Sequence, residues 1–262
     1  MQGIDISSNN HAGEPFNFLQ VKDEGYEVVY VKATQGNNYL NEYLIADVRD
    51  AFNNGLKVGV YHFYDAAKGT PEEQAQWFIT NGLNQVAEWA RLVPMLDYES
   101  LSTAAERDTF LRTLGRECGV YTTRSIHTAI GYGSDIGWLA WPGWTPSNVV
   151  PSDTAIVQTG QQLVEGIGGN PNGATTTTDV DTILNASAIG AAATPTPTPT
   201  NEEDEEMGTT VITEDGHIVS YLLDPKTEHW VELTRKPGTE GQPMSGDNVS
   251  LIDINDSFPT VV

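Results

Sequence analysis

The feature that most constrains the fold is an alternation of strand-like and helix-like segments that stops near the middle of the chain. Short apolar runs, typical of buried strands, alternate with segments whose apolar residues recur at three- and four-residue steps, typical of amphipathic helices. Five predicted strands are each followed by a helix, and three later ones by none. The predicted strands are 3–6, 28–31, 56–64, 92–97, 118–122, 137–141, 155–159 and 177–184. This pattern predicts an α/β fold, a closed TIM-like barrel whose helical coat is missing on one side.

Two of the predicted helices begin with capping boxes. Thr70 precedes Pro71 and Glu73, and Thr103 precedes Glu106 by three residues. In each pair the hydroxyl and the carboxylate satisfy backbone N–H groups of the first helical turn, and Pro at the first helical position needs no such partner. The other predicted helices cover about 17–24, 41–54 and a short segment that ends near residue 130.

The acidic composition limits the partners. The 262 residues include 13 Lys and Arg against 36 Asp and Glu, a formal net charge of −23. Nucleic acids and anionic membranes are polyanions, so neither is expected as a partner. The first residues, MQGIDISSNN, contain neither a basic nor an apolar segment, and no apolar run reaches the ~18 residues of a membrane span. We therefore expect a chain made in the cytoplasm without a signal peptide.

Neither a metal nor a cofactor is predicted. The single cysteine, Cys118, excludes an intramolecular disulfide, so stability has to come from the core. His62 lies in a predicted strand, where a hydrogen-bonded buried histidine is commoner than a metal ligand. No cluster of His and Cys has the spacing of a metal site.

A change of composition divides the chain into three parts. Residues 191–206 are a Pro-Thr repeat followed by acids, a composition typical of an extended, exposed spacer. We therefore predict a barrel domain over 1–190, a linker over 191–206 and a small β-rich module over 207–262, in which Asp215-Gly216 is a hairpin signal.

The C-terminal module is expected to bind an uncharged ligand or a protein. Residues 1–190 contain 10 basic and 22 acidic residues (−12), and residues 191–262 contain 3 and 14 (−11), so the shorter part is the more densely acidic. Such a surface repels other polyanions within a Debye length of ~8 Å at physiological salt. A protein or a neutral glycan is the partner expected for this module.

Two acids stand at the end of a predicted central strand, in the sequence PMLDYES. Asp97 and Glu99 are two residues apart, so in a strand they share one face while Tyr98 takes the other. Neighbouring like charges raise the pKa of at least one carboxyl group, which can then donate a proton to a leaving group. Two solvated acids are the simpler alternative. Asp5, in the first predicted strand, is a further acid that a buried position would make costly.

With these acids and a barrel predicted, residues 1 to about 185 resemble the family 25 glycoside hydrolases, the N,O-diacetylmuramidases or Chalaropsis-type lysozymes. The resemblance is carried, in the family's order, by GIDISSNN, YVKATQG, NNGLKVGVYHF, PMLDYE, GVYTT, GWLAWPG, IVQTG and DVD. It implies a (β/α)5β3 barrel with an acidic groove at the carboxyl ends of the strands. It also implies cleavage of the β-1,4 bond between N-acetylmuramic acid and N-acetylglucosamine in peptidoglycan, whose glycan strands would be the substrate.

The resemblance also assigns roles to residues. Glu99 matches the catalytic acid, Asp97 its partner in stabilising the transition state or a participating N-acetyl group, Asp5 the first-strand aspartate and Asp181 the last-strand one. Asp179 competes with Asp181 for that last position. The residues expected to bind substrate are Tyr61, Lys32, Tyr121, Trp141 and Gln158, with Lys32 as a buried partner to an acid.

The chain departs from the family pattern in places, and a second function stays open. Gln35 stands where the family commonly has Glu, and segments 142–154 and 165–174 fit poorly. A muramidase with a linker and a small module resembles a phage endolysin or a virion-borne wall hydrolase, which would act on the cell wall after release by a holin or from the virion. This resemblance implies a virion protein or a neutral glycan, and not an anionic wall polymer, as the partner of the C-terminal module. The alternative is a catalytically inactive barrel that serves as a wall-binding or virion structural protein.

Overall fold

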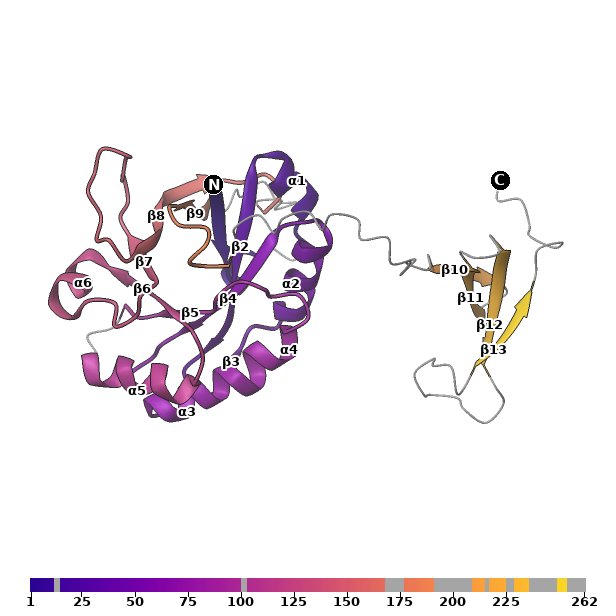
Figure 1. Cartoon of the computed structure of the whole chain (residues 1–262), viewed down its shortest axis with the longest axis horizontal. Coiled ribbons are helices and arrows are strands. Elements are labelled where there is room, and N and C mark those ends of the chain that lie inside the picture. Colours follow the sequence, from indigo (N-terminus) through magenta and orange to yellow (C-terminus); the bar gives the residue numbers. More distant parts are fainter. Residues whose placement is uncertain are drawn as a thin grey trace. The chain divides into compact units, whose positions relative to one another are not determined.

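The computed structural model describes residues 1–11, 15–99, 103–167 and 177–190, and four strands beyond residue 208. The chain separates into two compact units, residues 1–194 and 195–262, each with its own sheet (Figure 1).

The first unit is the closed eight-stranded barrel that the strand pattern predicts. Its sheet runs in the order β1-β9-β8-β7-β6-β5-β4-β2-β3, and a further pairing of β1 with β2 closes the ring. The short strand β3 pairs only with β2, outside the ring. The strands are β1 Gln2–Ile6, β2 Tyr26–Gln35, β3 Tyr39–Leu40, β4 Lys57–Phe63, β5 Met95–Asp97, β6 Gly119–Thr123, β7 Gly137–Ala140, β8 Thr154–Leu163 and β9 Thr177–Ile183.

Several strands differ in their bounds from the sequence prediction, including β2, which is longer at both ends than the predicted 28–31. For two others the physical reason is clear. β5 starts at Met95 and not at residue 92, because Pro94 has no N–H to give to a neighbouring strand. β8 extends to Leu163, beyond the predicted end at 159, because its polar second half pairs with β9.

The direction of the last strand matters most for the site. Seven of the barrel strands run parallel to one another, whereas β9 is antiparallel to its two neighbours, β8 and β1. The carboxyl ends of the parallel strands therefore meet the amino end of β9 at one mouth of the barrel.

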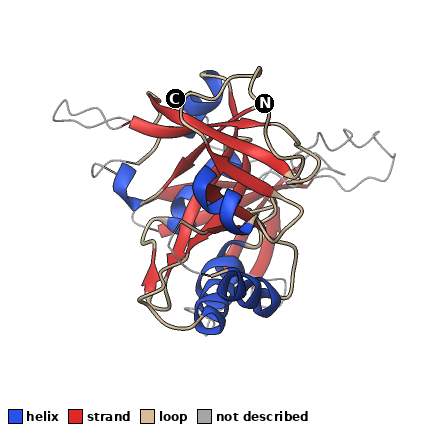
Figure 2. Cartoon of the chain, turned by 90° about the vertical axis from the view of Figure 1, so that its left-hand side faces the viewer, coloured by secondary structure: helices blue, strands red, loops and turns tan. Residues whose placement is uncertain are grey.

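The helices cover only part of the barrel. Both predicted capping boxes are confirmed, with Thr70 capping α3 and Thr103 capping α5. α3 and α5 lie side by side outside the strands (Figures 1 and 2). The helices are α1 Phe18–Asp23, α2 Leu44–Asn53, α3 Pro71–Trp77, α4 Asn84–Val86, α5 Ala104–Leu114 and α6 Arg124–Ile130, with a 3-10 turn Ser8–Asn10 and a π-helical turn Phe78–Leu83. In the described residues from 131 to 190 there is no helix, as the sequence predicts.

The barrel has an outer and an inner layer of apolar side chains. Along β2, Val29 and Val31 pack outward against the helices, and Val28 and Tyr30 pack inward. Inside, the Trp138 ring lies 5.2 Å from the Tyr30 ring, measured between centroids. This alternation closes the interior below the mouth and leaves the mouth free for a site.

The inner layer is completed by the last described residues of the unit. Ile189 is fully buried in it, and its carbonyl accepts a hydrogen bond of 3.1 Å from the Val93 amide. The Tyr30 hydroxyl donates to the carbonyl of the same Val93 at 3.0 Å. The barrel therefore needs the chain up to residue 190.

The second unit contains a four-stranded antiparallel sheet in the order β10-β11-β12-β13. Its strands are β10 Thr209–Glu214, β11 His217–Asp224, β12 His229–Arg235 and β13 Val249–Asp253. The predicted turn residues Asp215 and Gly216 lie outside the described residues. Within the described part of the chain, no helix is both long and apolar enough to span a bilayer.

Ile189 provides a test of where the barrel domain ends. A chain of residues 1–190 should unfold cooperatively with a free energy of unfolding close to that of the full chain. A chain of residues 1–186 should lose about 2 kcal/mol, because it lacks the buried Ile189 side chain. Urea unfolding followed by circular dichroism measures both. An unfolded 1–190 chain would show that the tail completes the barrel.

Candidate active site

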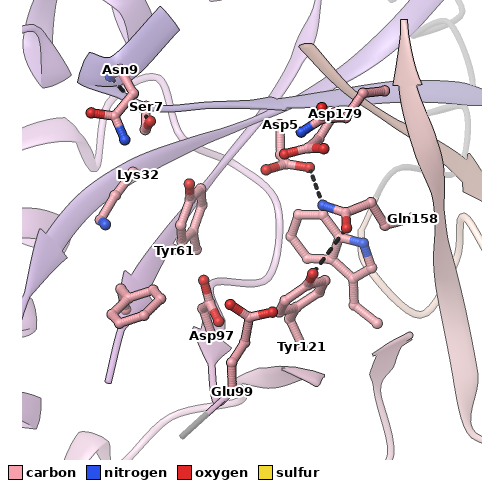
Figure 3. A pocket seen from close by; sticks show the side chains of 13 residues that line it. Asp5, Ser7, Asn9, Lys32, Tyr61, Asp97, Glu99, Tyr121, Gln158 and Asp179 are labelled. Carbon is pink, nitrogen blue, oxygen red and sulfur yellow. Dashed lines mark hydrogen bonds between the residues drawn. The ribbon is translucent and has the colours of Figure 1, made fainter. Parts of the chain in front are cut away.

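A cavity of about 390 Å³ opens at the mouth where the parallel strands have their carboxyl ends (Figure 3). Active sites of such barrels form at this end, where side chains from several strands converge. The cavity is lined by Asp5, Ser7, Asn9, Lys32, Tyr61, Phe63, Asp97, Glu99, Tyr121, Trp138, Gln158, Gln161 and Asp179.

Four carboxylic acids from three regions of the barrel line this cavity. Asp97 ends β5 and Glu99 follows two residues later, and both reach the cavity while Tyr98 between them is buried. The Tyr98 hydroxyl donates to a backbone carbonyl at 2.8 Å, on the other side of the strand. Asp5 of β1 and Asp179 of β9 are register partners across the seam that closes the barrel.

The four acids hold their protons more tightly than ordinary carboxyl groups. Burial, and then the negative charge of Asp179, raises the pKa of Asp5 from 3.8 to about 8, against the hydrogen bond from Gln158. Burial and the charge of Glu99 raise the pKa of Asp97 well above its usual range. The pKa values of Glu99 and Asp179 are also raised, mainly by burial. A cluster of this kind retains protons near neutral pH.

Asp97 and Glu99 differ in access. Asp97 is 9% exposed, and among the described residues nothing hydrogen-bonds its buried Oδ1 atom. Glu99 is exposed at the cavity wall. A buried carboxyl oxygen without a protein partner is costly unless a ligand supplies a donor.

A chain of hydrogen bonds joins the two sides of the cavity. The Tyr121 hydroxyl donates to Oε1 of Gln158 at 2.9 Å, and Nε2 of Gln158 donates to Oδ2 of Asp5 at 3.0 Å (Figure 3). Tyr121 also hydrogen-bonds Glu99. The single hydroxyl proton of Tyr121 can be given to Gln158 or to the ionised carboxylate of Glu99, and the bond to Glu99 lowers the pKa of that carboxyl group. Gln158 therefore couples Asp5 to Glu99 through Tyr121.

Lys32 lies in the cavity, but no acid among the described residues forms the expected ion pair with it. Its ammonium donates to Oε1 of Gln35 at 2.7 Å and lies 4.6 Å from the Phe63 ring centroid. Gln35 occupies the place of a Glu in the family pattern, so the contact carries no opposite charge. Burial lowers the pKa of Lys32, while the charges of Asp97 and Glu99 raise it. Lys32 therefore affects Asp97 and Glu99 through the electrostatic field of its charge.

The last-strand acid in the cavity is Asp179, and not Asp181. Asp181 is 1% exposed and lies one layer deeper, where its Oδ1 accepts a hydrogen bond of 2.9 Å from Nε1 of Trp138. In a last strand parallel to the others, Asp181 near the carboxyl end would reach the mouth. Because β9 is antiparallel, residues near its amino end reach the mouth instead.

The three aromatic residues expected to bind substrate lie in two different places. Tyr61 and Tyr121 line the cavity as expected. Trp141 does not, because it follows the end of β7 and lines a separate pocket with Arg124. His62 is buried and hydrogen-bonded, with Nδ1 2.8 Å from the Thr34 hydroxyl.

Sequence reasoning missed several lining residues. Ser7 and Asn9 lie in the polar cluster after the first strand, which the sequence shows as a loop and nothing more. Gln161 lies beyond the predicted end of its strand, and only the pairing with β9 carries it to the cavity. In the described residues, no group of three or more His, Cys, Asp or Glu is arranged to hold a metal ion.

The family model described as "Glycosyl hydrolases family 25" matches residues 4–154. The autolytic lysozyme of Clostridium acetobutylicum is 29% identical over 178 residues, which cover 65% of this chain and 54% of that protein. The N,O-diacetylmuramidase of Chalaropsis sp is 33% identical over 103 residues, which cover 38% of this chain and 47% of that protein. The chain thus spans about half the length of these relatives.

Solved structures show the same fold. The bacterial lysozyme of Streptomyces coelicolor superposes with a TM-score of 0.57 at 25% identity, covering 73% of this chain and 98% of that one. The catalytic domain of an endolysin from bacteriophage P40 of Listeria monocytogenes gives a TM-score of 0.57 at 17% identity, covering 72% and 95%. At that identity the second comparison concerns the fold alone.

The raised pKa of Asp5 predicts a pH-dependent stability. The folded state binds this proton more tightly than the unfolded chain, so the contribution is complete below pH 3.8 and is lost as the pH rises through about 8. The free energy of unfolding should therefore fall over this range, by at most about 1.4 kcal/mol per pH unit for this one proton. Asp5→Asn should flatten the slope in urea unfolding at pH 5, 6, 7 and 8. Asp23→Asn, at an exposed site in α1, is the control that should keep the wild-type slope.

Proposed function

Because the chain belongs to glycosyl hydrolase family 25, we propose that it hydrolyses the β-1,4 bond between N-acetylmuramic acid and N-acetylglucosamine in peptidoglycan. The names of its relatives, lysozyme and N,O-diacetylmuramidase, support this substrate. The observation that carries the proposal is the cavity of four acids with raised pKa values at the mouth of the barrel. Glycoside hydrolysis needs a proton donor and a carboxylate near the anomeric carbon, and this cavity supplies both.

In this proposal Glu99 donates the proton to the glycosidic oxygen. It is the exposed member of the Asp97 and Glu99 pair, so a leaving group can reach it. Its raised pKa keeps the carboxyl group protonated at a higher pH than usual. After bond cleavage the Tyr121 hydrogen bond stabilises the carboxylate that remains.

In this proposal Asp97 interacts with the sugar that contains the reacting anomeric carbon, and not with the leaving group. Its Oδ1, which has no hydrogen-bond partner in the described part of the chain, can accept a hydrogen bond from the N-acetyl N–H of the substrate or stabilise the positive charge that develops at the anomeric carbon. The field of Lys32 favours the ionised form of this carboxyl group as the reaction proceeds.

Asp5 and Asp179 complete the acidic wall, and the sugar contacts come from Tyr61, Tyr121 and Gln158. The charge of Asp179 helps to hold the proton on Glu99 before reaction. An aromatic ring such as that of Tyr61 gives the apolar face of a sugar ring a surface to stack on. All four acids face one cavity, which weighs against a catalytically inactive barrel.

Replacement of Glu99 tests the proton donor. Glu99→Gln keeps the size of the side chain and should lower the release of reducing sugar from purified peptidoglycan about a thousandfold. The fold should be retained, because Glu99 is exposed and lies beyond the end of β5. Glu88→Gln, an exposed acid elsewhere, is the matched control and should retain wild-type activity. Activity of Glu99→Gln above about a tenth of wild type would assign the proton to another group.

We propose further that the chain reaches the wall as a phage lysin, either released from the host cytoplasm or carried in the virion. A catalytic unit, a Pro-Thr and acidic linker and a second small unit suit an enzyme that is held at one place while it cuts at another. The acidic C-terminal part, with 14 acids against 3 bases, suits a protein partner or a neutral glycan better than an anionic wall polymer.

Pull-downs with the full chain and with residues 1–190 test the C-terminal part. The full chain should be retained by purified virions, or by walls stripped of anionic polymer, more strongly than the 1–190 chain. At low salt, intact Gram-positive walls should retain the full chain less strongly than the 1–190 chain, because residues 191–262 add a formal charge of −11. Tight, tail-dependent binding to intact walls at low salt would contradict the electrostatic argument.

A further inference from the structure

A second pocket lies at the rim of the barrel, between α6 and the segment that follows β7. It has a volume of about 180 Å³. Arg124 and His127 of α6 line it on one side, and Trp141 and Val149 line it on the other. None of its lining residues is acidic, although the chain has a formal net charge of −23. The pocket is therefore a locally basic place on an acidic protein.

The guanidinium group of Arg124 is held in place by an aromatic ring, and no carboxylate of the described residues balances its charge. Its central carbon lies 4.0 Å from the ring centroid of Trp141, so the planar group stacks on the indole. Among the described residues, no carboxylate pairs with it and its side-chain N–H groups donate no hydrogen bond. Stacking fixes the plane of the group and leaves its N–H donors directed outward around the edge. This arrangement suits a carboxylate, which can accept two parallel hydrogen bonds.

The pocket and the catalytic cavity are lined from the same two chain segments, β6 and β7 with the residues that follow them. Tyr121 of β6 and Trp138 of β7 are register partners, and both line the cavity. Arg124 comes three residues after Tyr121, and Trp141 three residues after Trp138. Each stands directly after the end of its strand, about 10 Å further along the chain if the rise per residue is that of a strand. The backbone amide of Trp141 donates to the carbonyl of Gln158 at 3.0 Å, and the Gln158 side chain lies in the cavity. A group attached to a sugar in the cavity can therefore reach the pocket.

We propose that Arg124, stacked on Trp141, binds a carboxylate of the peptide stem of peptidoglycan. This inference rests on the proposed function. The glycan backbone has no strong need of a guanidinium, whereas the stem carries free carboxylates. Val149, which is 90% exposed, and the free part of the indole give apolar surface for the small side chains of a stem. Attachment to a sugar already in the cavity raises the local concentration of the carboxylate, which offsets the repulsion of an acidic chain.

The test compares substrates with and without the stem; removal of the stem leaves a lactyl carboxylate on each muramic acid, directly beside the sugar ring in the cavity and not at the distance of the pocket. Peptidoglycan oligomers are used intact or after an amidase has removed their peptides, and kcat/KM is measured for each with the full chain. Arg124→Ala should lower kcat/KM about tenfold on the stem-bearing oligomer and leave it unchanged on the stem-free one. Arg124→Lys should recover only part of the loss, because it keeps the charge but not the planar fork. Arg116→Ala, an exposed arginine before the start of β6, should change neither value.

A binding measurement separates this proposal from the proposed function. Calorimetry of a stem-bearing muropeptide with Glu99→Gln should give a dissociation constant about tenfold lower than with the double variant Glu99→Gln, Arg124→Ala. If the wild type cleaves neither oligomer, the proposed function fails and this comparison still decides the pocket. Equal losses on both oligomers, or equal dissociation constants, would overturn the stem site. A loss confined to walls that retain their phosphodiester polymer would also overturn it, since the anion would then be a phosphate.

Discussion

The structure depends on the closure of the barrel at β1. This strand pairs with β2 in parallel and with β9 antiparallel, so it is the seam between the first and last parts of the barrel. Its register makes Asp5 the neighbour of Asp179. Two like charges meet where the ring closes, and burial adds to their cost. The same seam that completes the fold therefore creates a cluster that has to keep protons.

Those protons link the fold to the proposed chemistry. A carboxyl group that is neutral in the resting protein can donate a hydrogen bond or a proton, and an ionised one can stabilise positive charge. The hydrogen-bonded chain from Asp5 through Gln158 to Tyr121 lets one side of the cavity respond to the ionisation of Glu99 on the other. The site behaves as a coupled unit, and its pKa values belong to the group of acids as a whole.

The sequence predicts those parts that depend on local patterns. Strands, capped helices and the pairing of Asp97 with Glu99 on one face follow from periodicity and capping chemistry, and the structure contains them. The direction of β9 depends on long-range pairing that no local pattern encodes, and the exchange of Asp181 for Asp179 in the cavity follows from it. The position of Trp141 beside Arg124 depends in the same way on the pairing of β6 with β7. The contact of Lys32 with Gln35 is local, because the two residues lie three positions apart in β2.

The seam also has a consequence for how the protein is made. Within the barrel, β1 is made first and β9 last, so about 175 residues separate the partners Asp5 and Asp179. Until β9 has emerged, β1 and β8 have open edges that can pair with other chains. Asp5 and Asp179 cannot become neighbours in this interval either. A nascent or truncated chain is therefore prone to aggregate, and its acidic cavity is incomplete until the ring is closed.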